Sequence, residues 1–135
     1  MTVAPVSPDV EAAVKSALKV ALPMLGGRVF YGVPGGNPTL PLLTVALISG
    51  GPDDSEAPLE QTRLTFSCWG KTKFEASDVR RALVTWMRSL RSTQLDSSTF
   101  CYEVNFIAST WAPDDEAGLA RYVVDATFVV TYRSA

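Results

Sequence analysis

Hydrophobic and polar residues alternate without a break over residues 121–133. Side chains along a strand point alternately to opposite sides of a sheet, so every second residue shares a face. One face is apolar and carries Tyr122, Val124, Ala126, Phe128, Val130 and Tyr132. The other face is semi-polar and carries Arg121, Val123, Asp125, Thr127, Val129, Thr131 and Arg133. The pattern predicts a strand with one face in the core and the other face partly covered.

Four further segments have strand-like patterns. Residues 42–48 are apolar almost continuously, which is typical of a strand buried on both faces, so we expect this strand to be central. Residues 61–69 alternate strictly, and a shorter strand is predicted over residues 28–33. Alternation over residues 99–110 predicts the last of the four, with Phe100, Tyr102, Val104 and Phe106 on one face and Cys101, Glu103, Asn105 and Ile107 on the other.

The first predicted helix begins at Ser7 and Pro8, where Ser7 suits the N-cap and Pro8 the first helical position. Its apolar residues recur every four positions as Val10, Val14, Leu18 and Leu22. This spacing places them on one narrow stripe of a helix. Pro23 and the glycine pair at residues 26–27 are expected to end it.

The second predicted helix begins at a capping box formed by Thr72 and Glu75. Its apolar face contains Val79, Ala82, Leu83, Trp86 and Leu90. The remainder is strongly basic and contains Arg80, Arg81, Arg88 and, just beyond, Arg91. The helix is therefore expected to pack on the sheet by one side and to present positive charge on the other.

The order of elements is helix, three strands, helix, two strands. It predicts an α+β fold in which a mixed, mainly antiparallel sheet packs against two helices. The 135 residues suit one domain over 1–135, of a size that buries about two-thirds of the surface of the unfolded chain. We expect residues 1–6 to form a flexible N-terminus.

The composition excludes several classes of protein. A net charge of −2 and a pI near 5.0 disfavour a protein that binds nucleic acid by neutralising phosphates. The chain has no histidine, and so lacks the usual general base and the commonest metal ligand. The N-terminus lacks a basic region followed by an apolar run, and no segment has the roughly 18 apolar residues of a membrane span. We therefore expect a globular, intracellular protein without a cofactor.

The two cysteines, Cys68 and Cys101, both lie in predicted strands. A free cysteine in a strand is most often a small buried hydrophobic residue, and a disulfide between neighbouring strands is the alternative. A catalytic cysteine needs a positive, accessible environment and a partner base, which a place beside Leu64 and Phe66 does not offer. The sequence thus predicts buried thiols and no enzyme.

Two acidic loops and a glycine-rich turn are the other candidates for a binding site. The turn around Gly35 and Gly36 lacks the lysine and the following helix of a phosphate-binding loop. The acidic loops contain Asp53, Asp54 and Glu56 in the first, and Asp114, Asp115 and Glu116 in the second. Neither has the alternating ligand spacing of a calcium loop, so solvated loop charge is favoured over a metal site.

The basic face of the second helix allows three interpretations. It is a solvated face, a weak nucleic-acid contact, or a surface that pairs with the acidic loops of another copy. The third would produce a head-to-tail contact that can close into a ring. The residues assigned to this subunit-interface hypothesis are Arg80, Arg81, Arg88, Asp53, Asp54, Glu56, Asp114, Asp115 and Glu116.

Taken together, these segments resemble the tail terminator proteins of long-tailed bacteriophages, also called tail-completion or minor tail proteins. The resemblance lies in the strand at residues 41–45, the acidic loop after it, residues 63–70 leading into the capped helix, and residues 118–126 leading into the last strand. It covers residues 10–133 as a pattern of strands, helices and loops.

The resemblance implies a structural virion protein that forms a homo-hexameric ring. Such a ring caps the head-proximal end of the tail tube, stops polymerisation of the major tail tube protein and presents the docking surface for the head–tail connector protein. DNA passes through its channel only in transit, and no membrane or active site is involved. The implied location is the head-proximal end of the virion tail, after assembly in the host cytoplasm.

Two alternatives remain. A head-closure or connector protein of the phage neck shares small size, mixed α/β composition and ring symmetry. The other is a small α+β ligand-binding or enzymatic domain whose site is shaped by loops alone. The absence of histidine and of a convergent polar cluster counts against this second alternative.

Overall fold

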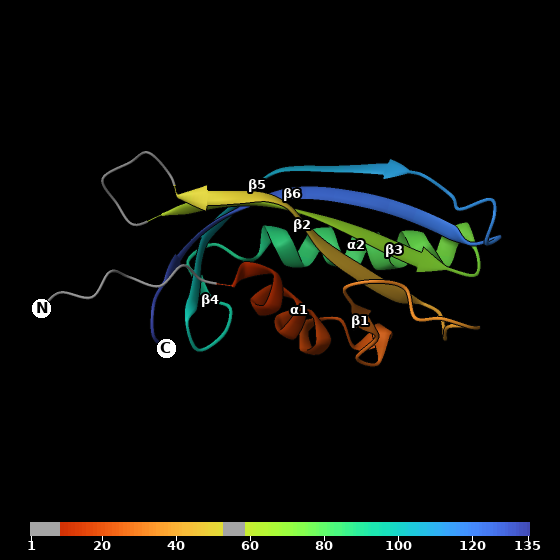
Figure 1. The fold of residues 1–135 in the computed structure, drawn as a ribbon, viewed down its shortest axis with the longest axis horizontal. Helices are drawn as coiled ribbons and strands as arrows, with labels where there is room; N and C mark the ends of the chain where they lie inside the picture. Colours follow the sequence, from red (N-terminus) through yellow and green to blue (C-terminus); the bar gives the residue numbers. More distant parts are fainter. Residues whose placement is uncertain (1–8, 53–58) are drawn as a thin grey trace, which may run out of the picture.

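A computed structural model describes residues 9–52 and 59–135, with only the backbone of Gly51 and Pro52 described (Figure 1). Its elements, in order, are α1 (Val10–Ala21), the 3-10 helix η1 (Pro23–Leu25), β1 (Val29–Phe30), β2 (Leu42–Pro52), β3 (Glu60–Gly70), α2 (Lys73–Arg88), β4 (Thr93–Gln94), β5 (Thr99–Trp111) and β6 (Ala120–Tyr132).

The strands form one six-stranded sheet in the order β1-β2-β3-β6-β5-β4. All neighbours are antiparallel except β1 and β2, which are parallel. Both α-helices of the described chain pack against the same face of the sheet, as Figure 1 shows. The predicted α+β fold is therefore confirmed.

The core lies between this face of the sheet and the helices. In β6, the predicted apolar face is buried at Val124, Ala126, Phe128 and Val130. Tyr132 is 43% exposed because it is the last residue of the strand. In β3, Leu64, Phe66 and Cys68 are fully buried as predicted.

The prediction that residues 42–48 form a central strand, buried on both faces, was wrong. β2 is second from the edge of the sheet, and β1 pairs only with its residues Leu43 and Thr44. Leu42, Leu43 and Val45 are buried, but Leu47 is 53% and Ile48 47% exposed. A bulge between Leu47 and Ser49 shifts the register at this point, and the strand continues to Pro52.

The predicted alternation of β5 is interrupted by two bulges, between Cys101 and Glu103 and between Asn105 and Ala108. The bulges change which residues face the core: Cys101 is fully buried, while Phe106 is 83% exposed. A bulge places two residues opposite one and re-aims the side chains. The prediction of regular alternation over residues 99–110 was therefore wrong after the first residues of the strand.

Helix α1 begins two positions later than predicted, with Val10 instead of Pro8 as its first residue. Asp9 is the N-cap, and its Oδ1 accepts a hydrogen bond from the Ala12 N–H at 3.0 Å. Ser7, Pro8 and the predicted flexible N-terminus, residues 1–6, lie outside the described residues. The apolar stripe at Val10, Val14, Leu18 and Leu22 is buried, as predicted.

Helix α2 begins at the predicted cap. The Thr72 hydroxyl accepts a hydrogen bond from the Glu75 N–H at 3.2 Å. Glu75 Oε1 in turn accepts from the Lys71 N–H at 2.9 Å, one residue before the donor that a standard capping box uses. Two backbone donors at the helix start are thus satisfied, and the chain turns sharply from β3 into α2.

Two short strands differ from the sequence prediction. The strand expected over residues 28–33 is reduced to β1, Val29–Phe30. The expected loop before β5 contains β4, Thr93–Gln94, which pairs with the start of β5.

Candidate assembly surfaces

In the part of the chain that the structure describes, one face of the sheet carries no helix, and we call it the open face (Figure 1). The register of β2, β3 and β6 shows which residues lie on the same side of the sheet as Thr65 and Asp125. They are Thr44, Ala46, Arg63, Thr65, Ser67, Trp69, Arg121, Val123, Asp125, Thr127 and Val129. This face includes the semi-polar side of β6, whose residues from Arg121 to Val129 are all half-buried. The predicted partial cover is therefore provided within the domain by neighbouring side chains.

Two contacts explain that cover. The Arg121 guanidinium lies over the Trp69 ring at 5.0 Å, and its Nε donates a hydrogen bond to the Ala112 carbonyl at 2.7 Å. This contact leaves Trp69 only 6% exposed. Arg63 and Asp125 form an ion pair at 3.8 Å, which is exposed and so contributes little to stability.

The basic face of α2 is not uniform. Arg80 is half-buried: its guanidinium lies 5.0 Å from the centre of the Tyr122 ring, and its Nη2 donates to the Ser77 hydroxyl at 3.4 Å. Burial of its Nε leaves that atom without a hydrogen-bond partner. Arg80 thus joins α2 to β6, and a solvated role for it was wrong.

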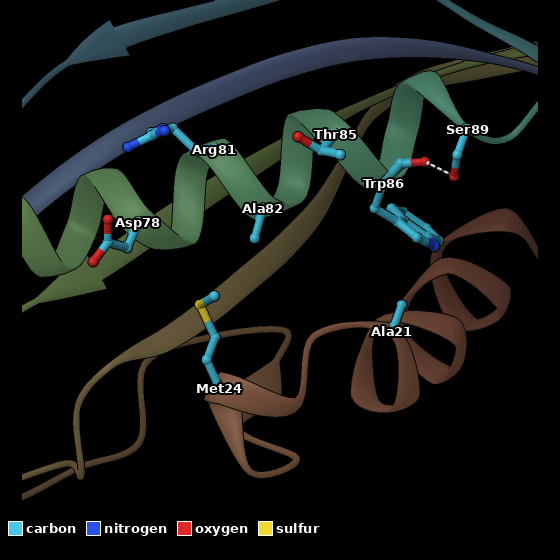
Figure 2. A pocket seen from close by; sticks show the side chains of 8 residues that line it. All are labelled: Ala21, Met24, Asp78, Arg81, Ala82, Thr85, Trp86 and Ser89. Atoms are coloured by element: carbon cyan, nitrogen blue, oxygen red, sulfur yellow. Dashed lines mark hydrogen bonds between the residues drawn. The ribbon is translucent and has the colours of Figure 1, made fainter.

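Arg81 and Arg88 are exposed, as expected for a contact surface. Arg81 lines an open groove of about 640 Å³ between the two helices. Figure 2 shows Ala82 and Trp86 of α2 facing Met24 and Ala21 across this groove. The lining combines these apolar side chains with the polar side chains of Asp78, Arg81, Thr85 and Ser89.

The second acidic loop is a structured turn between β5 and β6. The Asp114 carboxylate accepts a hydrogen bond from the Ala117 N–H at 3.1 Å, and the Asp114 backbone bridges to Leu119. Asp115 and Glu116 are exposed. Asp114 therefore shapes the turn, while its two neighbours are free to contact another molecule.

Among the described residues, the structure shows no ion pair between the arginines on the basic face of α2 and the acidic residues of the second loop. The structure shows an ion pair between Arg63 and Asp125, and neither of these residues belongs to the candidate sets. The first acidic loop, with Asp53, Asp54 and Glu56, lies outside the described residues. The pairing of these charges between copies stays a prediction.

Sequence reasoning missed the exposed apolar residues at the bulges of β2 and β5, which are Leu47, Ile48 and Phe106. The continuous apolar run over residues 42–48 assigned Leu47 and Ile48 to buried positions, and alternation assigned Phe106 to a regular strand face. Only the register of neighbouring strands locates a bulge, so the sequence offered no direct signal for them.

Both cysteines are free and buried. Burial disfavours the thiolate and raises the pKa of Cys68 and of Cys101 from 9.0 to about 12. These values weigh against a nucleophilic role and against a thiol-based metal site. Groups of three or more metal-ligating side chains were not found among the described residues, nor was a helix long and apolar enough to cross a membrane.

The raised thiol pKa leads to a prediction. The folded chain is expected to resist alkylation by iodoacetamide at pH 8, and to react at both cysteines once unfolded in guanidinium. The same shift makes stability depend on pH, because the unfolded Cys68 loses its proton near pH 9 while the folded thiol keeps its proton. The free energy of unfolding that this shift contributes is therefore fully present below pH 9. It falls as pH rises towards 12, by about 1.4 kcal/mol per pH unit. Mass spectrometry measures how many cysteines are alkylated, and rapid labelling of either cysteine in the folded chain would contradict the expected resistance to alkylation.

Comparison of the chain with models of known protein families, and with curated protein sequences, found no match.

Proposed function

We propose that this protein is a structural component of a phage tail, which forms a ring at the head-proximal end of the tail tube and terminates its polymerisation. The observation that carries the proposal is the architecture: a small α+β domain with helices on one face of a mainly antiparallel sheet and an open second face. The resemblance to tail terminators implies a small α+β domain, and this architecture fits that expectation. The burial of both cysteines, which raises the pKa of each thiol, also favours a binding role over catalysis by a thiol.

The charge distribution supports contact between copies. Arg81 and Arg88 stand exposed on α2, and Asp115 and Glu116 stand exposed at the turn between β5 and β6. Opposite charges on two different surfaces favour a heterologous contact, which can close into a ring. The half-buried Arg80 is less suited to this contact because it already packs on Tyr122.

Charge reversal tests this contact. The double substitution Arg81→Glu and Arg88→Glu is expected to weaken ring formation, measured by light scattering and electron microscopy. Because both side chains are exposed on α2, the domain should stay folded. Adding Asp115→Arg and Glu116→Arg should restore assembly, since the opposite charges would again face each other. Undiminished assembly of the Arg81→Glu/Arg88→Glu variant would reject the electrostatic contact.

Labelling of the virion tests the proposed location. An epitope tag at the C-terminus, detected with gold-conjugated antibody on purified phage, is expected to lie where head and tail meet. Label along the tail, at its distal tip or only in host debris would reject the proposal.

A further inference from the structure

Phe106 combines two features that are unfavourable in an isolated chain. Its φ is +54°, and its side chain is 83% exposed. A bulky residue in the left-handed region is strained, and its exposed ring gains little from burial. The position lies in the bulge between Asn105 and Ala108, where glycine is the favoured residue for a left-handed conformation. Strain of this kind suggests a role outside the single chain.

Phe106 lies on a strand whose outer edge is free. β4 pairs with β5 only at Phe100 and Cys101. From Glu103 to Trp111, β5 has β6 on one side and no strand of the described chain on the other. The outward N–H and C=O groups of such an edge are a template for another strand.

The opposite edge of the sheet has a matching feature. β2 has no strand on its outer side beyond Thr44 in the part of the chain that the structure describes. Leu47 and Ile48 are about half exposed at its bulge. The Glu11 carboxylate accepts a hydrogen bond from the Leu47 N–H at 2.6 Å, which satisfies one amide of this edge.

The register places the two bulges at the same level of the sheet. Ala46 of β2 pairs with Thr65, Thr65 pairs with Asp125, and Asp125 pairs with Ala108 of β5. The successive antiparallel pairings also make β5 run antiparallel to β2. A sideways repeat of the chain would therefore bring the β5 edge of one copy against the β2 edge of the next in antiparallel orientation.

We propose that a second copy of this chain binds along the free edge of β5 through its own β2 edge, with Phe106 packed against Leu47 and Ile48 of that copy. The contact is heterologous and can repeat head to tail until it closes. This inference rests on the proposed ring and adds a contact between strand edges to the charged contact between α2 and the turn that joins β5 and β6. Because Glu11 already occupies one amide of β2, the apolar contact of Phe106 is expected to anchor the joint.

Cysteine cross-linking tests the joint. Ala46 and Ala108 are both exposed, and the native Cys68 and Cys101 are buried. A chain carrying Ala46→Cys together with Ala108→Cys is expected to form a ladder of disulfide-linked multimers on oxidation, seen on a non-reducing gel. Chains with either substitution alone should stay monomeric on that gel.

Two outcomes would overturn the inference. Dimers of the Ala108→Cys chain alone would indicate a two-fold contact between β5 edges. Absence of the ladder at a chain concentration of about 1 mM, where even a weak specific contact is substantially occupied, would exclude the β5–β2 joint.

Substitution of Phe106 separates assembly from folding. Phe106→Gly removes the aromatic anchor and suits the left-handed backbone, so we expect self-association to weaken at least about tenfold while the fold stays intact by circular dichroism. The matched control is Phe74→Ala, since Phe74 is 85% exposed on α2 and belongs to neither edge strand, and its loss should leave association unchanged. Equal association of the Phe106→Gly and wild-type chains would overturn the inference.

Failure of the joint and failure of the proposed function give different results. Overlong tails in the absence of the gene, together with no cross-linked ladder, would leave the terminator function in place and reject this joint. Normal tails together with a ladder would reject the terminator function and retain the joint.

Discussion

Replacing Phe66 with alanine is expected to lower the free energy of unfolding by about 3–5 kcal/mol. Phe66 is fully buried on β3, and its ring lies 6.2 Å from that of Phe128 on β6, measured between ring centres. The two rings fill the space between the central strands and the helices, so truncation leaves a cavity that the surrounding residues close only in part. Because domains of this kind are stable by only about 5–15 kcal/mol, the loss is a large share of the total.

Chemical denaturation with urea measures this effect. Phe74→Ala is the matched control, since the same side chain is removed from a position that is 85% exposed. Its change is expected to stay within about 0.5 kcal/mol. Similar losses in the two variants would show that the core does not lie between the sheet and the helices as described.

Gly70→Ala is expected to lower the free energy of unfolding by about 2–3 kcal/mol. Gly70 is the last residue of β3, immediately before the turn into α2. A Cβ at this position would stand 2.6 Å from the backbone nitrogen of Ala76 and 2.9 Å from Cβ of Glu75. These atoms belong to the first turn of α2, which Thr72 and Glu75 hold by their capping bonds, so the helix cannot move aside freely.

Gly35→Ala serves as the control for this prediction. A Cβ at Gly35 would meet no atom within 4 Å, and its φ is not in the left-handed region. Its stability should match the wild type or rise slightly, because alanine reduces the freedom of the unfolded chain. Thermal unfolding of the two variants, followed by circular dichroism, is the measurement. An unchanged midpoint for Gly70→Ala would contradict the close approach of α2 to the end of β3.

The sequence predicted the interior of this fold well where one periodic pattern runs through an element. The alternation of β6 and the four-residue spacing of α1 identified buried side chains because burial on one face is a strong constraint on residue type. The start of α2 was also predictable, since Thr72 and Glu75 bond to backbone groups within one turn.

The sheet edges and the candidate contacts were less predictable. An apolar run such as residues 42–48 is compatible with burial on two faces or with exposure at an interface, and only the strand order distinguishes them. The bulges depend on pairing between segments that are distant in the sequence, so Phe106 and Ile48 were assigned to the wrong environment. Arg80 was grouped with the other arginines of the basic face of α2, whereas its long side chain packs on Tyr122.

Tail length tests the proposed role of this protein as a terminator most directly. Deletion of the gene from its parent phage, followed by electron microscopy of the lysate, measures the distribution of tail lengths. Tails longer than the wild-type length, beside filled heads that carry no tail, are the predicted result, and supplying the gene from a plasmid should restore uniform length. Tails of normal length in the deletion strain would contradict the role of this protein as the terminator.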